Sequence, residues 1–413
     1  MIIRTMVYNK FSIPADVKVN SVLLGLFLSL QTIMVYLFPS AEGGVATGGL
    51  LGIMYIACVA LIILNLLLTG TFSFKKIPLV GFLIAVILMV FYKYTQNIIG
   101  EPRTPFALYL MFTVMAFLMP MLTRIDSKIF FRTIMLISLL ALFRMDAVLA
   151  PMIASRGTIT MGYSYSFLTP VLVSLSYLIF FFKTDSATWK AIMGLSIIVN
   201  IVIAFMLIKY GSRGPVVAIL SMIAIPYILD FSKSKSGLHL KEGKTVIFIA
   251  CLAFGLVFFI PVLEFLKTFF SNFGLSLNFI DKFLRLSESD NIGGDRELIY
   301  EITMYGIYQR PLFGHGCDQF ENITGFSYPH NFFLQMLYDG GAILTTFIFI
   351  PLLRRLWKWK SECTKANFVI IMTLFFASVP GSMVSGDLWQ MVELWFFFGA
   401  VFSKQFVYKS ILK

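Results

Sequence analysis

Runs of about 20 apolar residues recur from one end of the chain to the other, and a helix of that length can cross the hydrocarbon core of a bilayer. In lipid the backbone must satisfy its own hydrogen bonds, so spanning segments are helices unless they close into a barrel. We count twelve candidate spans, at about 20–38, 46–68, 77–92, 105–123, 130–151, 166–182, 190–208, 214–231, 245–265, 331–351, 366–380 and 388–407. The sequence therefore predicts an all-α polytopic membrane protein, with residues 1–413 forming a single integral membrane domain.

The composition agrees with a membrane protein and argues against a soluble one. Apolar residues make up 58% of the chain and charged residues 13%, whereas soluble proteins hold about 45–50% and about 25%. The net charge of +12 is spread over short loops rather than gathered on one face, which excludes nucleic acid as a partner. The first apolar run lacks a convincing signal-peptide cleavage site, so we expect an uncleaved span. Four scattered cysteines and three separated histidines predict neither a disulfide framework nor a metal site.

The distribution of Lys and Arg predicts the orientation, because cytoplasmic loops carry an excess of positive charge. With the N-terminus inside, the inner segments hold 21 of the 33 Lys and Arg residues. The outer segments hold 10, five of them in the one long loop, residues 266–330. Both termini are therefore expected in the cytoplasm and this loop outside. An enzyme working there has no access to cytoplasmic ATP or nucleotide sugars, so its substrate must arrive activated and already across the membrane.

The segment Gly211-Ser-Arg-Gly-Pro215 opens the predicted span 214–231 and is a candidate anion site. Ser212 is a good helix N-cap, and Pro215 suits the first helical turn. The helix N-terminus would face outward, and its free N–H groups together with Arg213 would favour a phosphate. The competing interpretation is an arginine at the membrane interface that extends toward water beside an ordinary helix cap.

Residues 295–308 in the long loop are predicted to form an amphipathic helix on the bilayer surface, with Arg296 near its start. The apolar face follows helical spacing and consists of Leu298, Ile299, Ile302 and Tyr305. The competing interpretation for Arg296 is a solvated or salt-bridged side chain beside Asp295 or Glu297. The following Gln309-Arg-Pro311 should end the helix, and Gly314-His-Gly316 should form a turn.

Pro329-His-Asn331 leads into the predicted span 331–351 and would place His330 at the outer mouth of the bundle. Histidine can take up a proton near neutral pH, which makes His330 a candidate general base. The alternative is a histidine bonded into a helix cap, and His315 is read as a plain turn residue.

Arg144 and Asp146 are ionisable residues inside the predicted span 130–151, where isolated charges are costly. Two residues apart on one helix they would not face each other, so each is expected to have a partner elsewhere. Weaker candidates for a polar cavity are Tyr163, Tyr165, Asp387 and Glu393.

The order of these pieces resembles the O-antigen polymerase/O-antigen ligase superfamily of bacterial membrane glycosyltransferases. The matching segments cover about 211–341, and the predicted layout of spans extends the likeness to the whole chain. These segments are Ser212-Arg213-Gly214, Gly294-Asp-Arg296-Glu-Leu-Ile-Tyr300, Pro311-Leu-Phe-Gly-His-Gly316 with Phe320, His330-Asn331-Phe-Phe-Leu-Gln335 and Gly340-Gly341.

The resemblance implies a glycosyltransferase-C-type membrane fold and a multi-pass protein of the bacterial inner membrane. Its donor would be a glycan on undecaprenyl diphosphate, transferred with inversion, and no metal or cofactor would be required. Arg213 and Arg296 would bind the leaving diphosphate, with Ser212 and Asn331 as further substrate contacts, and His330 would be the general base. The product would be an O-antigen or capsular polysaccharide, and a chain-length regulator and a flippase would be the expected partners.

Two functions share this framework, and a third competes with it. We favour a polymerase, which adds the glycan to another lipid-linked repeat unit, over a ligase, which adds it to lipid A core or another acceptor. A flippase or other transporter of lipid-linked oligosaccharide is less favoured, because the polar candidates gather at the outer face. An internal repeat, or a cationic cavity open to both sides, would favour transport.

Overall fold

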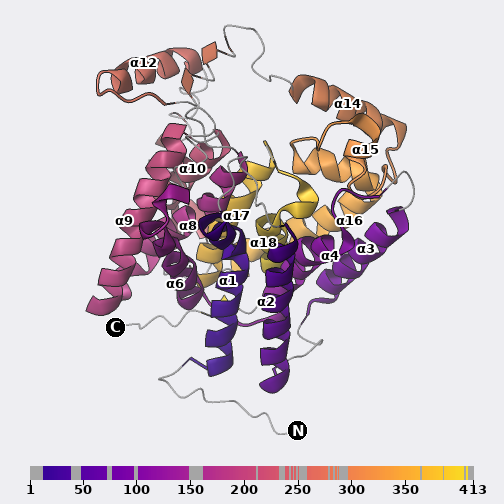
Figure 1. Ribbon diagram of the computed structural model, residues 1–413, viewed down its shortest axis with the longest axis horizontal. Helices are drawn as coiled ribbons and strands as arrows, with labels where there is room; N and C mark the ends of the chain where they lie inside the picture. The colour runs from indigo at the N-terminus through magenta and orange to yellow at the C-terminus, as the bar shows by residue number, and fades with distance from the viewer. Residues whose placement is uncertain are drawn as a thin grey trace.

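The computed structural model describes most of the chain as a bundle of helices (Figure 1). The described residues are 13–38, 48–71, 77–96, 101–147, 161–210, 213–231, 238–240, 243–244, 246–247, 250, 258–277, 280–281, 284–285, 287, 296–362, 365–384, 386–403 and 406–407. The α-helices are α1 (Ala15–Leu37), α2 (Gly48–Leu68), α3 (Leu79–Thr95), α4 (Phe106–Tyr109), α5 (Ala116–Leu122), α6 (Ser127–Ser138), α8 (Met161–Phe180), α9 (Ala187–Tyr210), α10 (Arg213–Ile228), α12 (Phe259–Ser271), α14 (Arg296–Gln309), α15 (Phe320–Thr324), α16 (Phe332–Glu362), α17 (Lys365–Ser382) and α18 (Val392–Phe402).

Short elements connect these helices. A π-helix, η2 (Leu110–Met115), joins α4 to α5, and the 3₁₀-helices are η3 (Leu139–Leu142), η4 (Phe182–Thr184) and η5 (Leu388–Gln390). Two small strand pairs occur: β1 (Ile125–Asp126) runs parallel to β4 (Phe406–Val407), and β2 (Leu229–Phe231) runs antiparallel to β3 (Leu238–Leu240).

Apolar helices confirm the prediction of an all-α membrane protein. Among the described residues, four helices are long and apolar enough to cross a bilayer, and shorter apolar helices accompany them. The long ones are Ala15–Leu37, Gly49–Leu68, Ala187–Tyr210 and Phe332–Lys358, and the shorter ones are Leu79–Thr95, Phe106–Leu122, Ser164–Phe180, Gly214–Ala224, Phe368–Ser382 and Val392–Phe402. The count of twelve spans stays a prediction.

Helices far apart in the chain pack closely where one of them carries a glycine. α18 packs on α5, and a Cβ on Gly399 would lie 2.8 Å from the backbone carbonyl carbon of Phe117. α1 packs on α6 in the same way, where a Cβ on Gly25 would lie 2.8 Å from Cβ of Thr133. Small residues let helix backbones approach each other closely. Close packing drives helix association in lipid, because the lipid tails are as apolar as the side chains between the helices.

Two predicted spans differ from the helices observed. Most of the span predicted at 245–265 lies outside the described residues; near its end Phe258 has non-helical dihedrals, and α12 begins at Phe259 and runs beyond the predicted end. In Figure 1, α12 lies across the end of the bundle beside α9 and α10. The span predicted at 388–407 is shorter, because Met391 interrupts the helix after η5 and Ser403 is extended.

Arg144 and Asp146 correct the sequence reasoning more directly. Regular helix ends at η3, so the two residues are not on one continuous helix and their side chains meet: Arg144 Nε lies 3.1 Å from Asp146 Oδ1. The Asp146 side chain is exposed and the Arg144 side chain is partly exposed. The expectation that each needed a partner elsewhere is therefore wrong, since it assumed an unbroken helix across residues 130–151.

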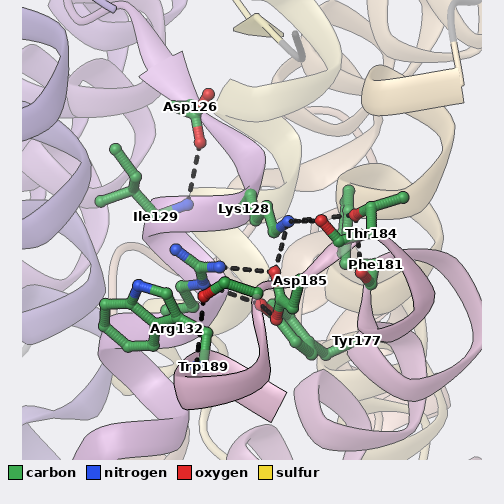
Figure 2. Close-up of polar contacts among 10 residues, drawn as sticks. Asp126, Lys128, Ile129, Arg132, Tyr177, Phe181, Thr184, Asp185 and Trp189 are labelled. Carbon is green, nitrogen blue, oxygen red and sulfur yellow. Dashed lines mark hydrogen bonds and ion pairs between the residues drawn. The ribbon is translucent and has the colours of Figure 1, made fainter. Parts of the chain in front are cut away.

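A buried ion-pair network ties α6 to the connection between α8 and α9 (Figure 2). The Asp185 carboxylate has a fully buried side chain and pairs with Lys128 and with Arg132, whose Nη2 lies 2.5 Å away. It also accepts a hydrogen bond from the Tyr177 hydroxyl, and the Arg132 guanidinium lies over the Trp189 ring, 4.1 Å from its centroid. By the predicted orientation this is the cytoplasmic end, opposite the end where α14 and α15 lie.

Candidate active site

The segment Pro311-Leu-Phe-Gly-His-Gly316 docks onto α16, and this contact explains why the motif is paired with Gly340-Gly341. α16 is kinked at Gly341, which has φ 63° and ψ −172°. The kink frees backbone groups that the turn satisfies: Ala342 N donates to Pro311 O (2.8 Å), and Ile343 N donates to Leu312 O (3.1 Å). In return, His315 N and Gly316 N donate to the carbonyls of α16 residues Tyr338 and Asp339, both at 2.8 Å.

Only glycine fits at the two contact points of this docking. A Cβ on Gly341 would collide with the Leu312 carbonyl and lie 2.6 Å from Phe313 N, and a Cβ on Gly314 would lie 2.6 Å from Gly341 N. Both glycines also have φ above +60°, a region that side chains disfavour. The predicted turn is therefore confirmed and is a fixed part of the structure rather than a free loop.

His315 has a structural position. Its side chain is buried, Nε2 lies 2.9 Å from the carbonyl oxygen of Gly306 in α14, and its ring stacks on Tyr338 at 4.4 Å. Burial lowers the pKa of His315. The residue thus joins the turn to α14 and α16, in agreement with its interpretation as a turn residue.

His330 occupies a left-handed backbone conformation, with φ 57°, directly before α16. Its ring is half-buried against Tyr328, with ring centroids 4.4 Å apart and planes at 60°. Burial and, second, the positive charge of Arg296 lower the pKa of His330, so the imidazole is neutral at pH 7. Its Nδ1 is buried and has no hydrogen-bond partner among the described residues. A neutral ring with an unpaired nitrogen is what a general base requires.

Arg296, the first residue of α14, is close enough to His330 for its charge to act on that ring. α14 was predicted at 295–308 and is observed at 296–309, so the helix is confirmed. Its buried face is different from the predicted one: Ile299, Thr303 and Gly306 are buried, whereas Leu298 is 53% exposed. Gly306 causes the difference, because Tyr338 of α16 lies where a larger side chain would be.

Asn331 acts as the N-cap of α16. Its Oδ1 accepts hydrogen bonds from the backbone N–H groups of Phe333 (3.0 Å) and Leu334 (3.1 Å). The cap is thus made by Asn331 and not by the neighbouring His330 ring. A contact between Asn331 and substrate stays a prediction.

Arg213 is the first residue of α10, so the helix begins at the predicted motif. The predicted cap, Ser212, and the Arg213 side chain lie outside the described residues. Gly214 packs against Tyr165 and Val384: a Cβ there would lie 3.1 Å from Tyr165 Cζ and 3.3 Å from Val384 Cγ2. α10 therefore begins beside the end of α17, close to the connection that leads to Asp387.

Three buried carboxyl groups, those of Asp318, Asp339 and Asp387, lie near one another beside this site. The sequence pointed to Asp387 as a weak candidate but not to Asp318 or Asp339. Asp318 Oδ2 accepts from Thr104 N (2.6 Å), and Asp339 Oδ2 accepts from Trp389 Nε1 (2.6 Å) and from Asp318 N (3.3 Å). Asp387 Oδ1 accepts from Gln335 Nε2 at 2.8 Å. Their side chains join the turn after Gly316, α16 and the α17–α18 connection.

The Asp318 and Asp387 carboxyl groups are close enough for the charge of one to act on the other, and Oδ2 of Asp387 is buried without a hydrogen-bond partner among the described residues. Burial and then the Asp387 charge raise the pKa of Asp318 to about 7, and burial raises the pKa of Asp387. Asp387, a weak candidate from sequence, is therefore part of the support of the site. Within the described part of the chain, no group of three or more His, Cys, Asp or Glu residues is arranged to hold a metal ion.

The comparison with known families covers this region. Residues 198–350 match the family model for O-antigen ligase. This match supports a relation of the segment to the O-antigen ligase/polymerase superfamily. The matched residues include Arg213, Arg296 and His330, and they confirm the resemblance predicted from the order of the motifs. The match supports a glycosyltransferase-like membrane enzyme of this general type. No curated protein matches the chain.

Proposed function

We propose that the protein is a polymerase that transfers a glycan from undecaprenyl diphosphate to a sugar hydroxyl of another lipid-linked repeat unit. The reaction would take place at the outer face of the bacterial inner membrane, with both termini in the cytoplasm. The observation that carries this proposal is His330, inside the segment that matches the family: its buried Nδ1 has no hydrogen-bond partner among the described residues, and burial and the charge of Arg296 lower its pKa.

In this mechanism His330 removes the proton from the acceptor hydroxyl as its oxygen attacks the anomeric carbon. The bond between that carbon and the diphosphate oxygen breaks, and undecaprenyl diphosphate leaves with the electron pair. Attack opposite the leaving group inverts the anomeric centre. Arg296 and Arg213 bind the diphosphate and stabilise the charge that grows on it, and the N-terminus of α10 supplies further N–H groups. No metal takes part.

Ligase activity is the second candidate, since the matching family model is described as O-antigen ligase. In a ligase the same donor chemistry would serve an acceptor such as lipid A core. In either case a flippase would deliver the donor, and a chain-length regulator would be a partner of the polymerase.

The test is transfer by purified protein in nanodiscs, given an undecaprenyl-diphosphate-linked repeat unit and no nucleotide sugar. A ladder of longer lipid-linked products supports the polymerase, and transfer only after an acceptor such as lipid A core is added supports the ligase. We expect His330→Ala to lower kcat at least 100-fold, the low end of general-base contributions, and Arg296→Lys to lose activity because a bidentate contact is lost. Full activity in a folded His330→Ala protein would refute the base assignment.

A further inference from the structure

One short segment of the chain contacts the residues that precede His330. It is Glu101–Thr104, between α3 and α4. Thr104 N donates to Asp318 Oδ2 at 2.6 Å, and the Glu101 carbonyl accepts from Asn322 Nδ2 at 2.9 Å. These contacts fasten the segment at both of its ends to residues that precede α16.

Arg103 makes the contacts in the middle of this segment. Its Nη1 donates to the Ser327 carbonyl at 3.3 Å, and its Nε lies 3.2 Å from Glu321 Oε2. The guanidinium carbon lies 6.0 Å from the centroid of the Tyr328 ring, within reach of a cation–π interaction. Arg103 therefore touches the chain on both sides of the turn that ends at Tyr328.

Tyr328 is in turn the aromatic neighbour of His330, with ring centroids 4.4 Å apart. The orientation of the imidazole depends on such a neighbour for two reasons. First, the backbone of His330 is left-handed. This conformation costs a non-glycine residue on the order of 1 kcal/mol or more and persists only when the surrounding structure holds it. Second, Nδ1 of His330 has no hydrogen bond among the described residues that would fix the ring.

We propose that Arg103 and Tyr328 are positioning residues for His330: Arg103 holds the Tyr328 ring in place, and Tyr328 orients the imidazole and shields it from water. This inference rests on the proposed role of His330 as the general base. It assigns a positioning task to the connection between α3 and α4, the second outer loop of the predicted topology, which lies outside the segment that matches the family, residues 198–350.

The chain offers matched variants for a test. Tyr328→Phe keeps the ring and Tyr328→Ala removes it, while Arg103→Gln removes the cation. Arg144→Gln is the control, because Arg144 is also in an ion pair and has a similar side-chain exposure, 36% against 39% for Arg103.

Kinetics should separate positioning from substrate binding. We expect Tyr328→Ala to lower kcat about 10- to 100-fold, a part of what a general base contributes, and to leave KM for the lipid-linked donor within about twofold. Arg103→Gln should lower kcat several-fold, and Tyr328→Phe and Arg144→Gln should retain it.

Two measurements would stay unchanged if Tyr328 had only a structural role: the pH profile of kcat/KM and the pKa of His330. Removing the ring rehydrates the imidazole, so in Tyr328→Ala the acidic limb of the kcat/KM profile should move to higher pH. Histidine NMR in detergent should show the same rise in the pKa of His330, and the chain has only three histidines to assign.

The outcomes distinguish this inference from the proposed function. An active His330→Ala protein would refute the base assignment itself. An inactive His330→Ala protein together with an unshifted His330 titration in Tyr328→Ala would refute only the positioning by Tyr328. An Arg103→Gln protein that behaves like Arg144→Gln would remove Arg103 from the proposal.

Discussion

The docking of the Pro311–Gly316 turn on the kink of α16 predicts a large cost for Gly341→Ala. The new Cβ would collide with the Leu312 carbonyl, a backbone group that cannot rotate away. The conformation at Gly341, φ 63° and ψ −172°, costs a residue with a side chain about 1–3 kcal/mol. Relieving the collision would also break the hydrogen bonds from Ala342 and Ile343 to the turn, each worth about 1 kcal/mol.

Together these effects amount to about 3–5 kcal/mol, a large part of a typical stability of about 5–15 kcal/mol. With about 2.1 cal/mol/K of unfolding entropy per residue and 413 residues, 1 kcal/mol corresponds to about 1 °C. Gly341→Ala should therefore lower Tm by about 4–6 °C.

Gly274→Ala is the matched control, because Gly274 also has a positive φ, +69°, but a Cβ there would meet nothing within 4 Å. It should cost only about 1 kcal/mol and thus about 1 °C. The assay is differential scanning fluorimetry in one detergent at a fixed scan rate, followed by glycan transfer. A decrease for Gly341→Ala no larger than for Gly274→Ala would refute the reasoning about the docking contact.

Two further predictions concern buried charge. Asp185→Asn should destabilise the protein by about 3–5 kcal/mol, because it leaves two cations without their buried counter-charge, whereas Asp146→Asn, in an exposed pair, should cost about 0–1 kcal/mol; equal Tm values for the two variants would contradict this. The pKa of Asp318 is raised to about 7 in the folded protein. Between about pH 4 and pH 7 the folded protein therefore keeps the Asp318 proton, whereas the unfolded chain has lost it. The contribution of Asp318 to stability is therefore present at low pH and is lost as pH rises through about 7, so Tm should be higher at pH 6 than at pH 8. Asp318→Asn should flatten that dependence, and an unchanged slope would show that another group causes it.

The helices and the main turn could be predicted from the sequence because they depend on local patterns. Long apolar runs become helices in lipid whatever their neighbours are, and Gln309-Arg-Pro311 ends α14 where expected. Gly314 and Gly341 were recognised as parts of a pattern, but their contact was not predictable, since it depends on a kink that only the packed structure reveals.

The carboxyl groups around Asp318 could not be grouped from the sequence, because Asp318, Asp339 and Asp387 come from three separate segments. One signal was available: Asp339 lies inside the predicted span 331–351, and a carboxyl group within a membrane span is a functional candidate by default. The pairing of Arg144 with Asp146 was missed for a local reason: a regular helix was assumed across a position where the chain turns.

The packing of α18 on α5 has a consequence for biosynthesis. α18 carries the chain back to helices that were synthesised much earlier, and the connection before it supplies Asp387 and Trp389 to the site. A chain that ended at residue 350, where the family match ends, would contain Arg213, Arg296 and His330 but would lack the partners that hold Gln335 and Asp339 in place. The smallest unit able to assemble this site therefore extends beyond the matching segment to at least Trp389, and a truncation before that residue should abolish function.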